Sequence, residues 1–111
     1  MHEKTTEYRL RNQPEISFSV RATCTGGGTE GAVARAHVCR VDGLKFRYEV
    51  RFQGEFCATK ANFDDEMYLE TALSLIKSQI ESHRYEDSQI VVEVNSGMPR
   101  TRLGVKLEGW D

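Results

Sequence analysis

The chain has 111 residues, of which 39% are hydrophobic and 29% charged, which is typical of a soluble globular domain rather than of a disordered chain. This length accommodates one domain with one modest core, and no apolar run approaches the roughly 18 residues that span a membrane. The formal net charge of −2 gives no bulk attraction to nucleic acids or membranes, so any electrostatic function requires local patches.

The N-terminal residues 1–15 are weakly patterned, and we expect them to form an arm or a short edge strand before a single domain over 16–111. They are charged and contain no apolar stretch, so we expect no signal peptide. The chain has three widely spaced cysteines, Cys24, Cys39 and Cys57. Without an export signal, these predict free thiols in a reducing cytoplasm.

Three segments, 16–23, 34–39 and 44–53, alternate between apolar and polar residues in the way of half-buried strands. Asp42-Gly43 indicates a hairpin between the second and the third. A two-residue loop would place apolar residues opposite charged ones. A three-residue loop with Gly43 in the left-handed conformation places apolar residues opposite apolar ones, so the pattern favours a bulged hairpin.

The second half of the chain predicts a helix and two further strands. Asn62 or Asp64 can cap a helix that runs to about Arg84 with one apolar stripe. Residues 56–59 before it either extend the third strand or form a short fourth one. Strands are also expected at 90–94, before a turn at 95–97, and at 103–107. The order β-β-β-(β)-α-β-β predicts an α+β domain, with a small antiparallel sheet of about five strands and one helix packed on its apolar face.

The glycine-rich stretch TGGGTEG, Thr25–Gly31, fits the pattern G-x-G-x-x-G and follows a predicted strand. Through Thr25, Gly26, Gly27, Gly28 and Thr29 it also resembles the Thr-Gly-rich turn of short-chain dehydrogenases, which implies a bound dinucleotide. However, residues 32–41 alternate like a strand and leave no room for the helix that would hold the phosphates. We therefore interpret the stretch as a mobile hairpin loop and expect no cofactor. This loop contains Gly26, Gly27, Gly28, Thr29, Glu30 and Gly31.

Catalytic and metal-binding patterns are not evident. The chain has no C-x-x-C or H-x-x-x-H pair, although His37 and Cys39 would share a sheet face. No cysteine or serine has a recognisable base and orienting group, so we expect no catalytic residues and no metal. The consecutive acids from Asp64 to Glu66 are typical of a helix N-terminus.

Charge is unevenly distributed along the chain. Residues 16–61 contain seven Lys/Arg and four Asp/Glu, whereas residues 62–96 contain two Lys/Arg and eight Asp/Glu. The predicted outward sheet face is basic and presents Arg21, Arg35, His37, Lys45, Arg47 and Arg51. The predicted helix is acidic and presents Asp64, Asp65, Glu66, Glu70 and Glu81, with Glu86 and Asp87 after it.

We expect a non-catalytic module that binds a protein partner through its charged faces, the acidic helix first among them. In size and charge layout it is similar to small phage-type inhibitors of bacterial defence complexes, anti-CRISPR proteins among them. The alternative is a nucleic-acid-binding domain that uses the basic sheet face, although single-strand readers use outward aromatic residues that are not expected here. A sheet edge could form a homodimer, and Trp110 could be a core residue or an anchor for a partner.

Overall fold

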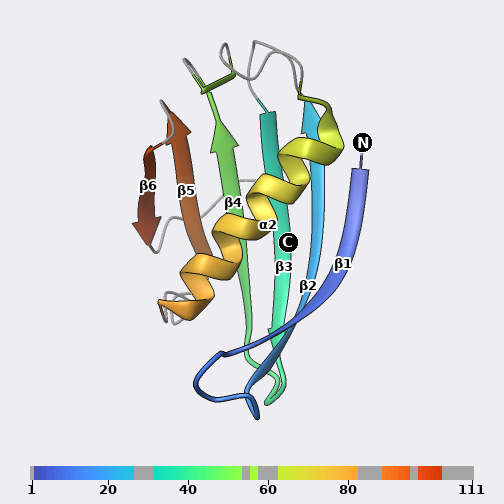
Figure 1. The fold of residues 1–111 in the computed structure, drawn as a ribbon, viewed down its shortest axis with the longest axis vertical. Coiled ribbons are helices and arrows are strands. Elements are labelled where there is room, and N and C mark those ends of the chain that lie inside the picture. Colours follow the sequence, from blue (N-terminus) through green and yellow to red (C-terminus); the bar gives the residue numbers. More distant parts are fainter. Residues whose placement is uncertain are drawn as a thin grey trace.

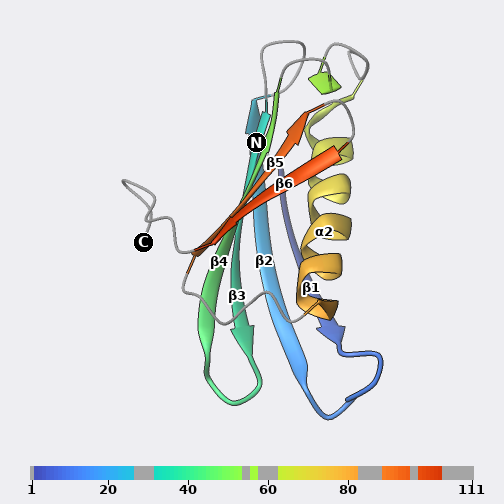
Figure 2. The same ribbon diagram turned by 90° about the vertical axis from the view of Figure 1, so that its left-hand side faces the viewer.

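The computed structural model describes residues 2–26, 32–53, 56–57, 63–82, 89–95 and 98–103. These residues form one six-stranded sheet, in which the strands follow one another in chain order, and a long helix that crosses one face (Figure 1). Figure 2 shows the two layers from the side, with the helix covering a single face of the sheet. The predicted small α+β fold with one packed helix is confirmed.

The described elements are β1 (His2–Arg9), β2 (Ser17–Gly26), β3 (Ala32–Arg40), β4 (Lys45–Phe52), α2 (Asp65–Glu81), β5 (Gln89–Asn95) and β6 (Met98–Leu103). Neighbouring strands are antiparallel except for β4 and β5, which are parallel. The sheet is therefore mixed, whereas we expected an antiparallel one. The reason is the connection, because a chain that leaves β4 and returns through a helix enters the next strand in the same direction.

The β3–β4 hairpin has the predicted three-residue loop. Gly43 lies in the left-handed region with φ of +95°, and its N–H donates to the Arg40 carbonyl at 2.8 Å. The Arg40 N–H donates to the Leu44 carbonyl at 2.7 Å and closes the turn. This loop sets Ala36 opposite Tyr48, as the pattern predicted.

Helix α2 begins after Asp64, whose carboxylate accepts the Met67 N–H at 2.9 Å, so the predicted cap is confirmed. Its buried stripe consists of Tyr68, Leu69, Ala72, Ile76 and Ile80. The helix packs on β1, β2 and β3, where small buried residues such as Ala22, Ala34 and Ala36 lie. Large aromatic residues of β4 fill the remaining space, so the core alternates small and large side chains.

Four other local predictions change. Phe56 and Cys57 are helical instead of extended, and Phe56 packs on Phe52 with ring centroids 5.3 Å apart. Gly26, expected in the mobile loop, ends β2 opposite Ala32. The last strand begins at Met98 rather than at residue 103. Helix α2 ends at Glu81, before the predicted end near Arg84. The N-terminal residues form the edge strand β1, one of the two expected alternatives. The loop residues Gly27–Gly31, Glu86, Asp87, residues 105–107 and Trp110 lie outside the described residues.

The substitution Gly43→Ala should lower the free energy of unfolding by about 1 kcal/mol, because a side chain disfavours the left-handed conformation. No other atom lies within 4 Å of the Cβ position, so the loss would come from the backbone and not from a steric clash. Gly43→Asn should cost less, since asparagine tolerates this region better. Urea unfolding checks this, and equal losses for the two variants would contradict it.

Candidate functional site

The sheet face opposite α2 is basic over its three central strands. The alternation of β2, β3 and β4 brings all the predicted basic residues to this one face: Arg21, Arg35, His37, Lys45, Arg47 and Arg51. Phe46, Tyr48 and Phe52 of β4 lie on the opposite, core face. In β1 to β5, as far as the structure describes them, the outward positions carry no aromatic side chain.

One row of this face consists of basic residues in direct cross-strand register. Arg21 of β2 pairs with His37 of β3, which pairs with Arg47 of β4. The row continues to Thr5 of β1 and Gln89 of β5, so its five register positions include no acid. The row therefore places two arginines on either side of a histidine on adjacent strands, and Arg21 also contacts Glu3 of β1 at 3.3 Å.

The neighbouring row contains a buried acid. Glu49 is only 3% exposed, and its carboxylate lies 3.2 Å from Nε of Arg35 and 2.7 Å from Nη2 of Arg51. Val91 of β5, which pairs with Glu49 in the register, is also buried. Glu49 therefore offsets part of the charge of the two arginines beside it, and the part of the face around Arg21, His37 and Arg47, the cationic part, lies next to them.

The cationic part is hollowed. A shallow cavity of about 500 Å³ is lined by Ser19, Arg21, His37, Val38, Cys39, Lys45, Phe46 and Arg47. These residues include four basic side chains and neither Asp nor Glu. Guanidinium groups bind carboxylates and phosphates with two parallel hydrogen bonds, and a lysine adds a mobile point charge. The cavity therefore suits anionic groups of a ligand or partner.

The acidic residues of α2 do not form one outward surface. Glu70 pairs with Lys4 at 2.7 Å, and the Glu81 carboxylate accepts from the Tyr8 hydroxyl and from the Arg11 N–H. Asp64 caps the helix, Asp65 is half-buried and Glu66 is exposed. On the helix surface farthest from the sheet lie Met67, which is 47% exposed, Ser74 and Ser78. Most of the predicted acidic residues thus make contacts inside this molecule.

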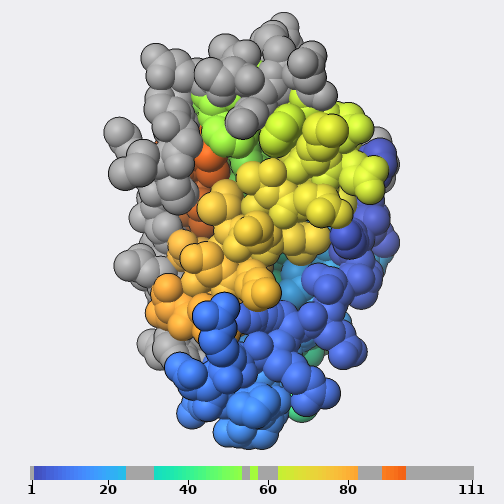
Figure 3. Space-filling model, viewed as in Figure 1, coloured from blue at the N-terminus to red at the C-terminus, as the bar shows by residue number. Residues whose placement is uncertain are grey.

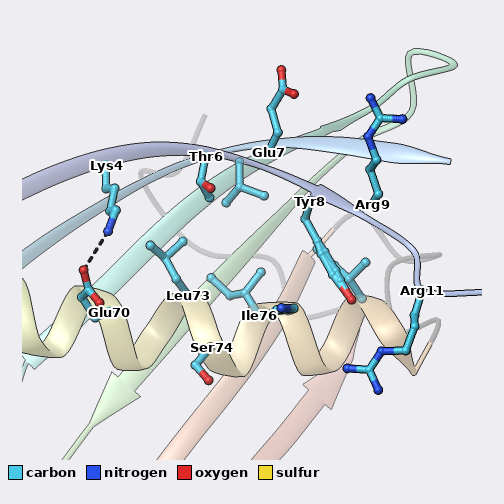
Figure 4. Close-up of a pocket in the computed structure, with 13 residues that line it drawn as sticks. Lys4, Thr6, Glu7, Tyr8, Arg9, Arg11, Glu70, Leu73, Ser74 and Ile76 are labelled. Carbon is cyan, nitrogen blue, oxygen red and sulfur yellow. Dashed lines mark hydrogen bonds and ion pairs between the residues drawn. The ribbon is translucent and has the colours of Figure 1, made fainter. Parts of the chain in front are cut away.

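These contacts span a second cavity, of about 550 Å³, between β1 and α2 (Figure 4). Its lining includes the aliphatic side chains of Val20, Ile76 and Ile80. Figure 4 shows Lys4 and Tyr8 directed toward the helix, and Figure 3 shows the surfaces of β1 and α2 meeting along one seam. The sequence did not indicate this cavity, because residues 1–15 are only weakly patterned.

Two of the three cysteines are separated from His37 by the sheet. Cys24 and Cys57 are buried on the core side with Tyr68, whereas Cys39 shares the outward side with His37. Burial, and then the Asp65 charge, raises the pKa of Cys24 to about 11, so its thiol stays protonated. Among the described residues, no group of three or more His, Cys, Asp or Glu could hold a metal ion.

Within the described part of the chain, no helix is long and apolar enough to cross a membrane. Comparisons of the chain with protein-family models, curated proteins and solved structures find no match.

Removal of the buried charge should destabilise the sheet. We expect Glu49→Gln to lower the free energy of unfolding by about 1–2 kcal/mol, because the amide loses the charged contacts of Arg35 and Arg51, which can still hydrate. Arg35→Gln should cost less than about 1 kcal/mol, since the Arg35 side chain is half-exposed. Urea unfolding of both variants gives the comparison. Equal losses would show that Glu49 is not the centre of this network.

The contact between Tyr8 and Glu81 predicts an alkaline transition. Burial, and then the hydrogen bond to Glu81, raises the pKa of Tyr8 from 10.0 to about 12. The native state therefore holds the phenol proton more tightly, and this stabilisation is present below pH 10 and disappears as the pH rises to about 12. Ultraviolet titration of tyrosinate should show that Tyr8→Phe removes a late-titrating group. If the tyrosine signal that Tyr8→Phe removes titrates near pH 10, the prediction is wrong.

Proposed function

We propose that this protein is a non-catalytic binding module that holds an acidic surface of a protein partner against its basic sheet face. The observation that carries the proposal is the register row Arg21–His37–Arg47, where basic residues lie directly opposite one another. Carboxylates brought by a partner would add charged hydrogen bonds to these side chains. The cavity beside it, with Lys45 and Ser19, offers donors for those carboxylates.

A protein partner fits this face better than a nucleic acid does. Single-strand readers stack bases on outward aromatic side chains, and the described residues of β1 to β5 present none on this face. Glu49 lies between Arg35 and Arg51 and already binds both guanidinium groups, so these two arginines are less available to a phosphate chain.

Nucleic acid remains the second candidate, and the cavity lining favours it. Arg21, His37, Lys45 and Arg47 surround the hollow without an acid among the lining residues, which is a suitable environment for phosphate groups. Such binding would weaken steeply with rising salt concentration.

The finer proposal is a small phage-type inhibitor of a nucleic-acid-handling complex. The acidic flank of α2 around Asp65, Glu66 and Glu70 would lie outside this contact, since Glu70 pairs with Lys4 within the molecule. The three free cysteines, with Cys24 and Cys57 buried, fit a reducing compartment such as the cytoplasm.

Two matched charge reversals test which face binds. Arg21→Glu with Arg47→Glu should weaken partner binding at least tenfold, because both substitutions place carboxylates against an acidic surface. Glu66→Lys with Glu70→Lys changes as many charges on the other face and should leave that binding within about threefold of the wild type. Capture of partners from the native host's lysate, with and without nuclease, followed by affinity measurement gives the result.

A protein captured in the presence of nuclease by the wild type and by the helix variant, and lost by the sheet variant, supports the proposal. If only the helix variant fails to capture the partner, the binding site lies on α2 instead. Capture that disappears after nuclease treatment would replace the protein partner by nucleic acid.

A further inference from the structure

The two edges of the sheet differ in their capacity to accept another strand. β1 and β6 are the edge strands, and β6 contains Pro99, which has no N–H. The N–H of Gln53, the residue after β4, donates to the Val94 carbonyl at 3.1 Å. Val94 therefore directs its N–H and C=O groups toward β4 and away from β6. Val94 lies opposite Pro99, and the alternation then places the proline nitrogen on the outer side. A donor is therefore missing from the β6 edge.

The β1 edge has no such interruption. Its eight residues pair consecutively with β2, and none of them is a proline. The Leu10 N–H donates to the Ile16 carbonyl at 3.1 Å, so even-numbered residues direct their backbone groups toward β2. The odd-numbered residues Glu3, Thr5, Glu7 and Arg9 then direct theirs to the outer edge, beside which Figure 1 shows no other described strand.

Contacts between β1 side chains and helix α2 also hold the strand in place. The even-numbered residues Lys4 and Tyr8 contact Glu70 and Glu81 of α2, and the Lys77 ammonium lies 5.0 Å from the centre of the Tyr8 ring. An incoming strand therefore meets an ordered template, which reduces the conformational entropy that pairing would cost.

We propose that β1 pairs antiparallel with β1 of a second copy, around a two-fold axis at Thr6. The charges along the strand favour this register. Glu3 then lies opposite Arg9 of the second copy, and the reverse pair follows by symmetry. A shift of the axis to Thr5 would place Glu3 opposite Glu7, and a shift to Glu7 would place Glu7 opposite itself. The exposed contact of Glu3 with Arg21, at 3.3 Å, leaves Glu3 accessible to the second copy.

The hydrogen bonds agree with this register. The pair Glu3–Arg9 and the pair Thr5–Glu7 consist of odd-numbered residues, whose N–H and C=O groups are those on the outer edge. The Thr6 residues face each other in a pair without hydrogen bonds, where Cα atoms approach to about 4.5 Å. The two sheets become continuous, with both helices on one side and both basic faces on the other. This inference is independent of the proposed function.

Sedimentation equilibrium tests the dimer and its edge. The wild type should dimerise with rising concentration, whereas Thr5→Pro, which removes an outward N–H not needed by β2, should stay monomeric with an unchanged circular dichroism spectrum. Thr5→Ala keeps the N–H and should still dimerise. A wild type that remains monomeric at millimolar concentration, or a Thr5→Pro variant that dimerises as the wild type does, overturns the proposal.

Charge exchange tests the register. Glu3→Arg alone and Arg9→Glu alone should each weaken dimerisation roughly tenfold, because each reversal affects two symmetry-related pairs. The double variant exchanges the charges and should recover most of the wild-type affinity. Failure of the double variant to recover, with both single variants weakened, overturns the Thr6 axis.

Crosslinking gives a readout that does not depend on affinity. In a Cys39→Ser background, Thr6→Cys should form a disulfide between copies under mild oxidation, since the two Cα atoms lie within disulfide range. Thr5→Cys is the matched control and should crosslink much less, because Thr5 lies opposite Glu7 of the second copy. Equal crosslinking of the two variants overturns the register.

Discussion

The register of the β3–β4 hairpin determines both surfaces of the sheet. With Gly43 left-handed in a three-residue loop, Ala36 faces Tyr48 inside and His37 faces Arg47 outside. A shift by one residue would bury the basic side chains under α2 and expose the aromatic ones. The core and the basic face therefore both depend on this one turn. A change in its register would exchange the side chains of the two faces.

Glu49 gives the outward face its pattern. Without an acid between Arg35 and Arg51, the outward face would carry only positive charge at these positions of β3 and β4. The Glu49 carboxylate contacts both, and the neighbouring row with His37 has no acid at its register positions. The face consequently has a polarity along the strands, which can orient a charged partner as well as attract it.

The elements with strong periodicity could be predicted from the sequence, and those defined by long-range contacts could not. The faces of the first three predicted strands, the Asp64 cap and the turn at Gly43 follow from local rules that operate over a few residues. The position of β1 depends instead on Lys4 and Tyr8 meeting residues of α2 far along the chain. The same contacts explain why the acidic residues of the helix, which a helical pattern alone predicts to be solvated, are largely engaged within the molecule.

The parallel pairing of β4 and β5 has a consequence for the order of folding. Strands β1 to β4 are consecutive neighbours joined by local turns, whereas β5 reaches β4 only after the 17-residue helix between them. Closing that longer loop costs more chain entropy before any contact is gained. The meander of β2, β3 and β4 can therefore form first and offer β4 as a template, on which the helix, with β1 beside it, and β5 then assemble. Substitutions at Val92 of β5 would accordingly act mainly on the rate of unfolding, and those at the Gly43 turn on the rate of folding.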